Sequence, residues 1–142
     1  MGTKRLFAVD LGASGGKCFA GLIEDGALSM EEIHRFPHEG VSFFLPDREG
    51  TVRERMHWDD VLIYQNIVAG LQAYGRDVSD TLDSIAIDTW GSDGHFMSED
   101  GEMLGKIYCY RDHRLDNMVG VIKKRIDAKE IYGITGIHFQ PF

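Results

Sequence analysis

Residues 8–17 of the chain read AVDLGASGGK, and the rest of the sequence is arranged around this stretch. A short apolar run ends at the acid Asp10, a turn of small residues follows, and Lys17 leads into a second apolar run at 18–23. This pattern predicts a β-hairpin whose tip admits a bulky anion, because glycine lacks a blocking Cβ and permits the positive φ of a tight turn. Successive backbone N–H groups there can bind phosphate oxygens, and Ser14 and Lys17 add a hydroxyl and a charge.

The turn departs from the two common phosphate-binding motifs. The P-loop pattern GxxxxGK[ST] is only half met, because Cys18 rather than Ser or Thr follows Lys17. The pattern GxGxxG is also absent, and a strand rather than a helix is expected after the turn. An ordinary hairpin with small residues at its tip therefore remains an alternative at this point.

Composition and charge narrow the class of protein. The chain has 142 residues, the size of one domain, and its 43% of hydrophobic residues suffice for a buried core. Fifteen Lys and Arg against 23 Asp and Glu give a net charge of −8, which argues against a nucleic-acid partner. No apolar run approaches membrane-spanning length, and Asp10 ends the run after Lys4 and Arg5 too early for a signal peptide.

The cysteines and histidines give no metal-binding pattern. Cys18 and Cys109 both lie in apolar, strand-like runs, and we expect them to be reduced core residues of a cytoplasmic protein. The six histidines are scattered, and Pro37 between His34 and His38 disfavours a helical pair there. No metal site is predicted from these residues.

Turn signals and periodicity predict the order of the strands. Asp25-Gly26 predicts a tight turn into a third strand at 27–36. Residues 37–55 mix Pro, Gly and charges and are expected to form a long loop. The run Ile-Ala-Ile-Asp at 85–88 predicts a strand buried on both faces. A second hairpin is expected from residues 94–97 and 106–110.

Three helical segments are expected. Asp59 caps a helix that runs to about Tyr74 and ends at Gly75, because apolar residues recur there at helical spacing. Asp112 is the expected N-cap of a helix over about 114–126. A last helical turn at 128–132 is expected to end at Gly133.

This order of elements predicts an α/β fold. The strand at 85–88 is expected to lie parallel to the first strand, which brings Asp10 and Asp88 to the same carboxyl-terminal edge of the sheet. Ligands of open α/β sheets bind beyond that edge. With Asp93 and Asp112, these acids could converge on a Mg²⁺ ion, which takes one or two carboxylates plus phosphate oxygens and waters. For each acid taken singly, a turn cap or a solvated surface acid is the preferred interpretation.

Two further segments have both a functional and a structural interpretation. In DTWGSD at 88–93, Trp90 could form a wall for the C–H face of a sugar, or it could be a core aromatic, as we expect for Trp58. In YRDHR at 110–114, Arg111 or Arg114 could line a polar pocket, or the acid between them could start a helix with a surface ion pair.

Four motifs in the same order resemble sugar kinases of the FGGY family: AVDLGASGGK, IDTWGSD, YRDHR and IYGITGIHFQPF. The resemblance covers almost the whole chain and is greatest to the branch that phosphorylates L-rhamnulose at O1. It implies an actin-like ATPase, ribonuclease-H-like α/β fold, of which residues 1–142 form an incomplete first domain. ATP, Mg²⁺ and a ketose would be the ligands, with no nucleic-acid or membrane partner.

The resemblance also implies roles for particular residues. Asp10 would lie at the metal and phosphate site. The ATP-phosphate hairpin would comprise Ala13, Ser14, Gly15, Gly16 and Lys17. The backbone at Gly91 would contact the ketose, with Asp88, Trp90 and Asp93 beside it. The catalytic base and the adenosine-binding domain of the family would lie beyond residue 142, so we assign no acid here as the base and expect residues 1–142 alone to be inactive.

Departures from the family pattern leave the substrate open. The turn has Gly15-Gly16-Lys17 where the branch has Ser-Gly-Arg, which keeps the charge but loses the bidentate fork of arginine. The glycine after Asp93, Gly94, resembles the corresponding residue of kinases that act on L-fuculose. A kinase of L-fuculose is therefore an alternative to a kinase of L-rhamnulose. Alternatives of another class are a two-metal nuclease of ribonuclease-H type, which would also use acids at these strand ends, and a non-catalytic binding module.

Overall fold

The computed structural model of the protein describes residues 2–140, which divide into two compact units. Unit 1 comprises Met1–Glu39 and Asp59–Gly91, and unit 2 comprises Gly40–Trp58 and Ser92–Phe142. Among the described residues, no helix combines the length and the apolar character needed to cross a membrane.

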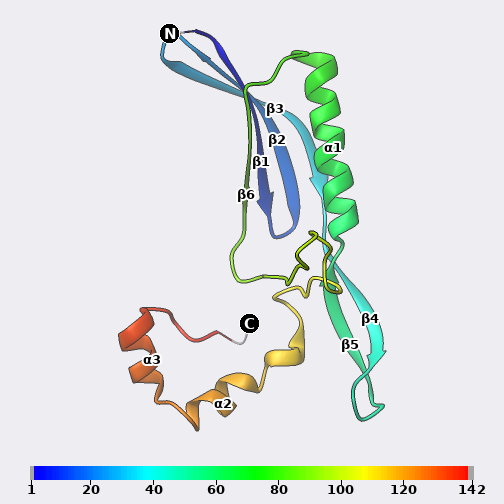
Figure 1. The fold of residues 1–142 in the computed structure, drawn as a ribbon, viewed down its shortest axis with the longest axis vertical. Helices are drawn as coiled ribbons and strands as arrows, with labels where there is room; N and C mark the ends of the chain where they lie inside the picture. The colour runs from blue at the N-terminus through cyan, green and yellow to red at the C-terminus, as the bar shows by residue number, and fades with distance from the viewer. Residues whose placement is uncertain (1, 141–142) are drawn as a thin grey trace. The chain divides into compact units, whose positions relative to one another are not determined.

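Unit 1 is built on a four-stranded mixed sheet with the strand order β3-β2-β1-β6 (Figure 1). Its strands are β1 (Lys4–Gly12), β2 (Gly15–Glu24), β3 (Ala27–Pro37) and β6 (Ser84–Thr89). β2 pairs antiparallel with β1 and β3, whereas β6 pairs parallel with β1. The predicted hairpin, third strand and parallel strand are all confirmed, and so is the turn at Asp25-Gly26, where both residues have positive φ.

Helix α1 (Asp60–Asp77) provides the crossover between β3 and β6 in unit 1. The predicted cap is confirmed, because Asp59 Oδ1 accepts a hydrogen bond of 3.0 Å from the N–H of Leu62. The predicted end at Gly75 is wrong. The helix continues to Asp77, and the N–H of Val78 closes the last turn on the carbonyl of Tyr74, because Gly75 keeps a helical backbone instead of turning left-handed.

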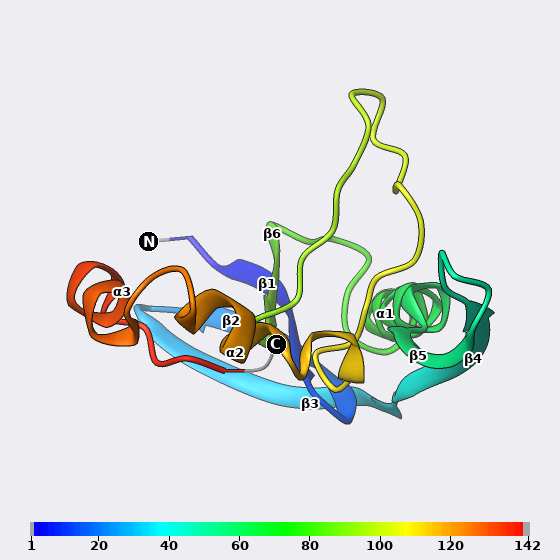
Figure 2. The same ribbon diagram turned by 90° about the horizontal axis from the view of Figure 1, so that it is seen from below.

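The core of unit 1 lies between α1 and one face of the sheet (Figures 1 and 2). Phe7, Val9 and Leu11 alternate along β1 and are buried on that face, and the Phe7 ring meets Tyr74 of α1 edge-on at 6.0 Å. The helix approaches β2 closely at Gly70, where a Cβ would lie 2.5 Å from Cys18 Sγ. Cys18 and Cys109 are buried and not disulfide-bonded, as predicted.

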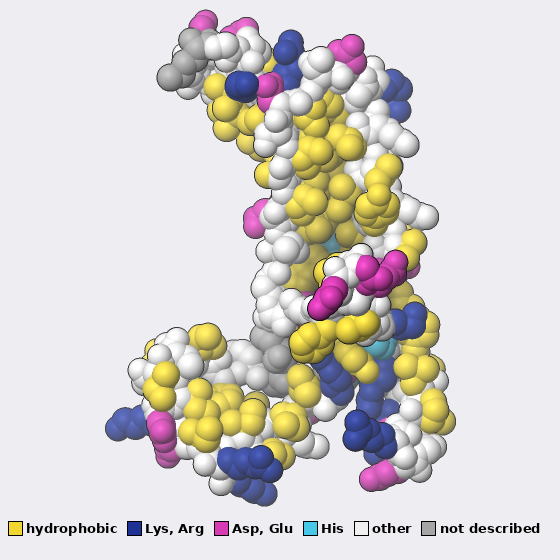
Figure 3. Space-filling model, in the orientation of Figure 1, with side chains coloured by type: hydrophobic (Ala, Val, Ile, Leu, Met, Phe, Trp, Pro, Cys, Tyr) yellow, Lys and Arg dark blue, Asp and Glu magenta, His cyan; other side chains and the backbone are white. Residues whose placement is uncertain are grey.

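Strand β6 is not buried on both faces, contrary to the prediction. Ile85 and Ile87 are 51% and 54% exposed. They pair with Phe7 and Val9 and so share the face that α1 covers, but α1 packs chiefly on β3 and β2. Figure 3 shows hydrophobic side chains exposed in unit 1 between β6 and α1.

Unit 2 contains a second antiparallel ribbon where a loop was expected. The strands β4 (Gly40–Pro46) and β5 (Val52–Trp58) pair along their whole length. The turn between them is closed by Asp47, whose carboxylate accepts from the N–H groups of Glu49 and Thr51 and pairs with Arg53 at 2.7 Å. Most of the ribbon is exposed, so its sequence lacks the alternation of a half-buried strand.

The remaining elements of unit 2 are short: the 3-10 helix η1 (His113–Leu115), α2 (Met118–Lys123) and α3 (Ala128–Thr135). The single helix expected at 114–126 is therefore wrong, although Asp112 caps η1 as predicted. Helix α3 ends at Gly136, which has φ +66°, and not at Gly133.

The second hairpin is only partly confirmed. Residues 96–104 form a tight loop in which Met97 pairs with Met103 and Gly101 has positive φ. Tyr108 pairs instead with His57 of β5. The segment at 106–110 therefore joins the ribbon rather than a hairpin of its own.

Candidate functional site

Four charged residues form a row across the sheet of unit 1. In register from β6 through β1 and β2 to β3, they are Asp88, Asp10, Lys17 and Arg35. Paired residues on neighbouring strands point to the same face of a sheet. Because Val9 and Leu11 on either side of Asp10 are buried under α1, the row lies on the opposite face.

A cavity of about 470 Å³ opens beside the tip of the first hairpin. It is lined by Asp10, Gly12, Ser14, Gly15, Gly16, Lys17, Arg35, Phe36 and Pro37. Five of the residues singled out from the sequence are thus brought together, and Ala13 lies in the turn between β1 and β2. Lys17 Nζ is 3.9 Å from Asp10 Oδ2, and both side chains are substantially exposed.

The glycines of the turn serve the protein's own packing. A Cβ on Gly16 would lie 2.2 Å from the Phe36 ring, and one on Gly15 would lie 2.7 Å from the Phe36 carbonyl oxygen. None of Gly12, Gly15 and Gly16 has a positive φ. The expectation that these glycines supply left-handed backbone is therefore wrong, and Gly15 and Gly16 are explained by the close approach of β3.

His38 connects the end of β3 to the turn, a role that sequence reasoning missed. Its ring is buried, and Nε2 lies 2.8 Å from the carbonyl oxygen of Gly12. Its backbone N–H donates to the carbonyl of Ser14 at 3.3 Å. The only available signal was its position directly after Pro37 at a strand end, which does not distinguish it from the other histidines.

Trp90, Asp88 and Gly91 follow one another at the end of β6. The half-buried Trp90 packs against the core cluster, and its ring lies 5.3 Å from that of His38, so it has the contacts of a core aromatic. The Asp88 carboxylate is exposed and accepts from the N–H of Thr89 at 3.0 Å. A Cβ on Gly91 would meet open space.

Asp93 and Asp112 belong to unit 2 and each has an internal partner. Asp93 Oδ2 accepts from Trp58 Nε1 at 2.6 Å. Trp58 is 4% exposed, which confirms it as a core aromatic. The residue before Asp93, Ser92, has φ +81°, a conformation that is uncommon for any residue other than glycine.

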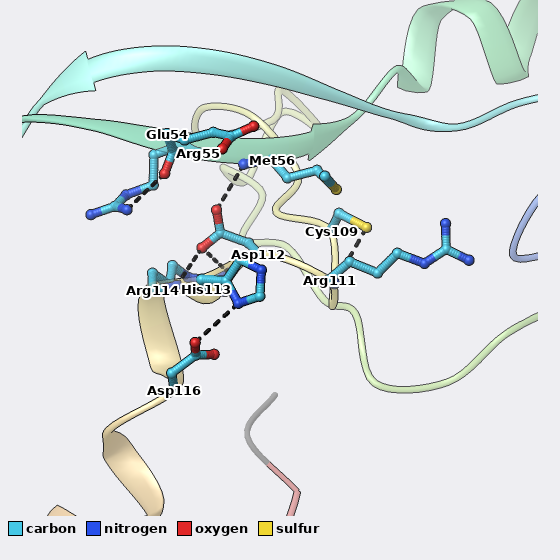
Figure 4. A network of polar contacts seen from close by, with 9 residues as sticks. All are labelled: Glu54, Arg55, Met56, Cys109, Arg111, Asp112, His113, Arg114 and Asp116. Atoms are coloured by element: carbon cyan, nitrogen blue, oxygen red, sulfur yellow. Dashed lines mark hydrogen bonds and ion pairs between the residues drawn. The ribbon is translucent and has the colours of Figure 1, made fainter.

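Asp112 organises the YRDHR segment (Figure 4). Its buried carboxylate accepts from the N–H of Met56 at 2.7 Å and from that of Arg114 at 2.9 Å, with the Arg114 guanidinium at 3.4 Å. Burial alone would raise the pKa of Asp112, but these hydrogen bonds outweigh it and hold the pKa below its ordinary value of 3.8. Asp112 is therefore a buried link between η1 and β5 rather than part of a surface ion pair.

Comparison with known sequences places the chain among sugar kinases. It is 34% identical over 139 residues to the rhamnulokinase of Bacteroides thetaiotaomicron, 37% over 139 residues to that of Mannheimia succiniciproducens and 34% over 135 residues to that of Bacillus subtilis. These matches cover 95–98% of the chain and 26–27% of each relative, so the chain spans about a quarter of their length. No protein-family model matches it.

Solved structures share the fold at low identity. A gluconate kinase from Lactobacillus acidophilus superposes with a TM-score of 0.67 at 15% identity, over 96% of this chain and 25% of that one. The glycerol kinase of Plasmodium falciparum, solved with ADP, gives 0.69 at 14% identity, over 99% and 27%. With the rhamnulokinase matches along nearly its whole length, these likenesses show that the chain belongs to the FGGY carbohydrate kinase family and has the α/β fold of part of its actin-like first domain.

Proposed function

We propose that this chain supplies the phosphate-binding hairpin and part of the sugar pocket of a kinase that converts ATP and L-rhamnulose to ADP and L-rhamnulose 1-phosphate. The observation that carries the proposal is the cavity at the hairpin tip, where the Ser14 hydroxyl, the Lys17 ammonium and the Asp10 carboxylate are brought together. The rhamnulokinase matches along nearly the whole chain support this choice of substrate over other sugars.

Phosphoryl transfer depends on positioning and on neutralising charge rather than on covalent chemistry of the protein. In the proposal, Lys17 and the backbone of residues 13–16 hold phosphate oxygens of ATP. The hydroxyl of Ser14 adds a hydrogen-bond donor. Asp88, Trp90 and Gly91 face the ketose. None of the acids in the chain is assigned as the base that accepts the proton of the sugar hydroxyl.

The carboxylates near the cavity fit a magnesium–nucleotide complex. Asp10 and Asp88 are register partners on neighbouring strands, and Mg²⁺ in such sites takes one or two carboxylates together with phosphate oxygens and waters. Among residues 2–140 no group of three or more His, Cys, Asp or Glu could hold a metal without the nucleotide. Bound there, Mg²⁺ would neutralise charge on the transferring phosphate.

A chimera tests the proposed substrate. Residues 1–142 replace the matching segment of the Bacillus subtilis rhamnulokinase, and ADP release is measured with L-rhamnulose and with L-fuculose at equal concentrations. We expect turnover with L-rhamnulose and a lower kcat/KM with L-fuculose. A folded chimera that binds ATP but prefers L-fuculose, or phosphorylates neither ketose, would contradict the assignment.

Two companion measurements separate the parts of the proposal. Asp10→Asn in the chimera is expected to raise the Mg²⁺ concentration needed for half-maximal rate, because one metal-facing charge is lost; an unchanged Mg²⁺ dependence would reject that role. Residues 1–142 alone are expected to give no turnover with ATP and L-rhamnulose. Robust turnover by this chain would show that it contains a base that we have not assigned.

A further inference from the structure

Arg35 lies beside the candidate phosphate site and outside the four sequence motifs. It is the register partner of Lys17 on β3, and it lines the same cavity. Its side chain is 61% exposed, so the guanidinium is accessible to a ligand. The cavity thus has two cations on adjacent strands, and one of them is an arginine.

A β-bulge determines what Arg35 contacts when the cavity holds no phosphate. Phe19 pairs with Glu32 and Cys18 with His34, so Ile33 is an extra residue on β3. In a regular strand, residues three apart point to opposite faces. The bulge brings Glu32 and Arg35 to the same face, where Arg35 Nε and Nη2 donate to the two carboxylate oxygens of Glu32 at 2.8 and 2.7 Å.

We propose that Arg35 binds the terminal phosphate groups of the nucleotide with its bidentate guanidinium fork, and that Glu32 is the internal counter-ion which the phosphate displaces. This inference rests on the proposed function, because it assumes that phosphates occupy the cavity. The two parallel N–H donors of a guanidinium that bind a carboxylate can bind two oxygens of a phosphate with the same geometry. Lys17, a point charge, lacks this planar geometry.

The exchange of partners at Arg35 has little energetic cost. An exposed ion pair contributes little net stability, and Glu32 is itself at the surface, so its carboxylate becomes hydrated when released. A triphosphate carries more negative charge than one carboxylate and also meets Lys17, which Glu32 does not bond. The hydrogen bond from Arg35, with the charges of Arg35 and Lys17, lowers the pKa of Glu32, so this counter-ion is ionised at neutral pH.

The test is calorimetric titration of the chain with magnesium tripolyphosphate and with MgATP. Arg35→Gln is expected to weaken binding of both about tenfold, the effect of losing one charge-assisted contact. Arg35→Lys keeps the charge but loses the bidentate fork, so its affinity is expected to lie between those of the parent chain and Arg35→Gln. Glu32→Gln is expected to strengthen binding about threefold, because it removes the competitor for the guanidinium.

Arg53→Gln is the matched control, since Arg53 donates from Nε to Asp47 at 2.7 Å in the same way but lies in unit 2. We expect the Arg53→Gln variant to bind magnesium tripolyphosphate and MgATP with the same affinity as the parent chain. Circular dichroism of each variant establishes that it is folded. Amide shifts of ¹⁵N-labelled chain at Gly12, Gly15 and Gly16 show whether the probe binds at the turn.

The outcomes distinguish the two proposals. If Lys17→Met weakens binding but Arg35→Gln does not, Arg35 is not a phosphate contact, and the proposed function stands. If Glu32→Gln weakens binding as much as Arg35→Gln, the pair acts structurally, and the inference is overturned. If the parent chain binds neither probe at the turn, both the phosphate site and the inference fail.

Discussion

The imidazole of His38 donates its Nε2–H to the carbonyl oxygen of Gly12 over 2.8 Å, because a carbonyl oxygen can only accept. This bond and the backbone bond to Ser14 attach the turn to the end of β3. The Trp90 ring packs on the same imidazole. At the scale of single residues, His38 is therefore a positioning residue for the turn and does not itself face the cavity.

Replacing His38 by Phe tests this positioning role. The ring remains, but the carbonyl of Gly12 loses its donor, so we expect the free energy of unfolding to fall by about 0.5–1.5 kcal/mol. We also expect weaker binding of magnesium tripolyphosphate. Urea unfolding and calorimetric titration measure the two effects. His38→Gln, which can still donate, should recover part of both, and an equal loss in Gln and Phe variants would argue for packing alone.

A second histidine makes the stability of unit 2 depend on pH. His57 is buried between the rings of Tyr108 and Phe43, at 4.3 and 5.7 Å. Burial lowers the pKa of His57 below its ordinary value of 6.5, more than the Asp112 charge raises it. The unfolded chain therefore binds a proton more readily, and stability is fully present above pH 6.5 and falls as the pH drops toward the folded pKa.

Urea unfolding of the parent chain and of His57→Phe between pH 7.5 and 5 measures this dependence. The parent should lose stability across the range, whereas the Phe variant, which retains an aromatic ring, should lose less. Asp112 contributes only at lower pH, because its depressed pKa matters below about 3.8. Parallel pH profiles of the two proteins would show that His57 does not titrate on unfolding.

At the scale of elements, two glycines of α1 have opposite expected responses to alanine. Gly70 packs against Cys18, where a Cβ would be 2.5 Å from the sulfur, whereas a Cβ on Gly75 would meet nothing within 4 Å. Gly70→Ala should destabilise by about 1–3 kcal/mol through overpacking. Gly75→Ala should stabilise by about 0.5–1 kcal/mol, because alanine loses less backbone entropy in a helix.

Thermal unfolding of both variants, followed by circular dichroism, gives the comparison. Both positions lie in the same helix, so a general effect of helix propensity would stabilise both proteins. Stabilisation by Gly70→Ala would mean that α1 does not approach β2 as closely as described.

Local patterns predicted the elements that have one clearly buried side and missed those that do not. The apolar alternation of β1 and the helical spacing in α1 gave both elements, and Asp59 gave the cap. The ribbon of β4 and β5 is exposed on most positions, so no period-2 pattern was present to detect. The end of α1 was misplaced because Gly75 can be helical as well as left-handed.

For the candidate site, too, the sequence predicted some of the residues and missed others. The predicted parallel strand puts Asp10 and Asp88 at the same edge of the sheet, and the parallel pairing of β1 with β6, with Asp10 opposite Asp88, confirms it. Arg35 and His38 were missed because their positions depend on a bulge and on a buried hydrogen bond between separate strands. Neither feature leaves a local pattern in the sequence.

At the scale of the whole molecule, the exposed isoleucines of β6 are expected to promote self-association of the chain. Ile85 and Ile87 lie next to one another on one face and are each more than half exposed, and contiguous apolar patches of this kind promote association. We expect the chain to bind a hydrophobic dye such as ANS. The double variant Ile85→Thr/Ile87→Thr should reduce dye fluorescence and raise solubility.

Val61→Thr is the control for this measurement, because Val61 is 60% exposed on α1 but lies on a different element. It should change dye binding little. Equal effects of the two substitutions would show that the dye reports general surface hydrophobicity rather than the face of β6.

β3 is an edge strand of its sheet, and β-bulges are common at sheet edges. Deleting Ile33 would restore a regular ladder with the same pairs, and Glu32 and Arg35, then two residues apart, would stay on one face. An extra residue inserted next to Ile33 would instead turn Glu32 to the other face, and the guanidinium would lose its carboxylate partner. The number of residues in this strand, and not only their identity, therefore sets the charge presented at the mouth of the cavity.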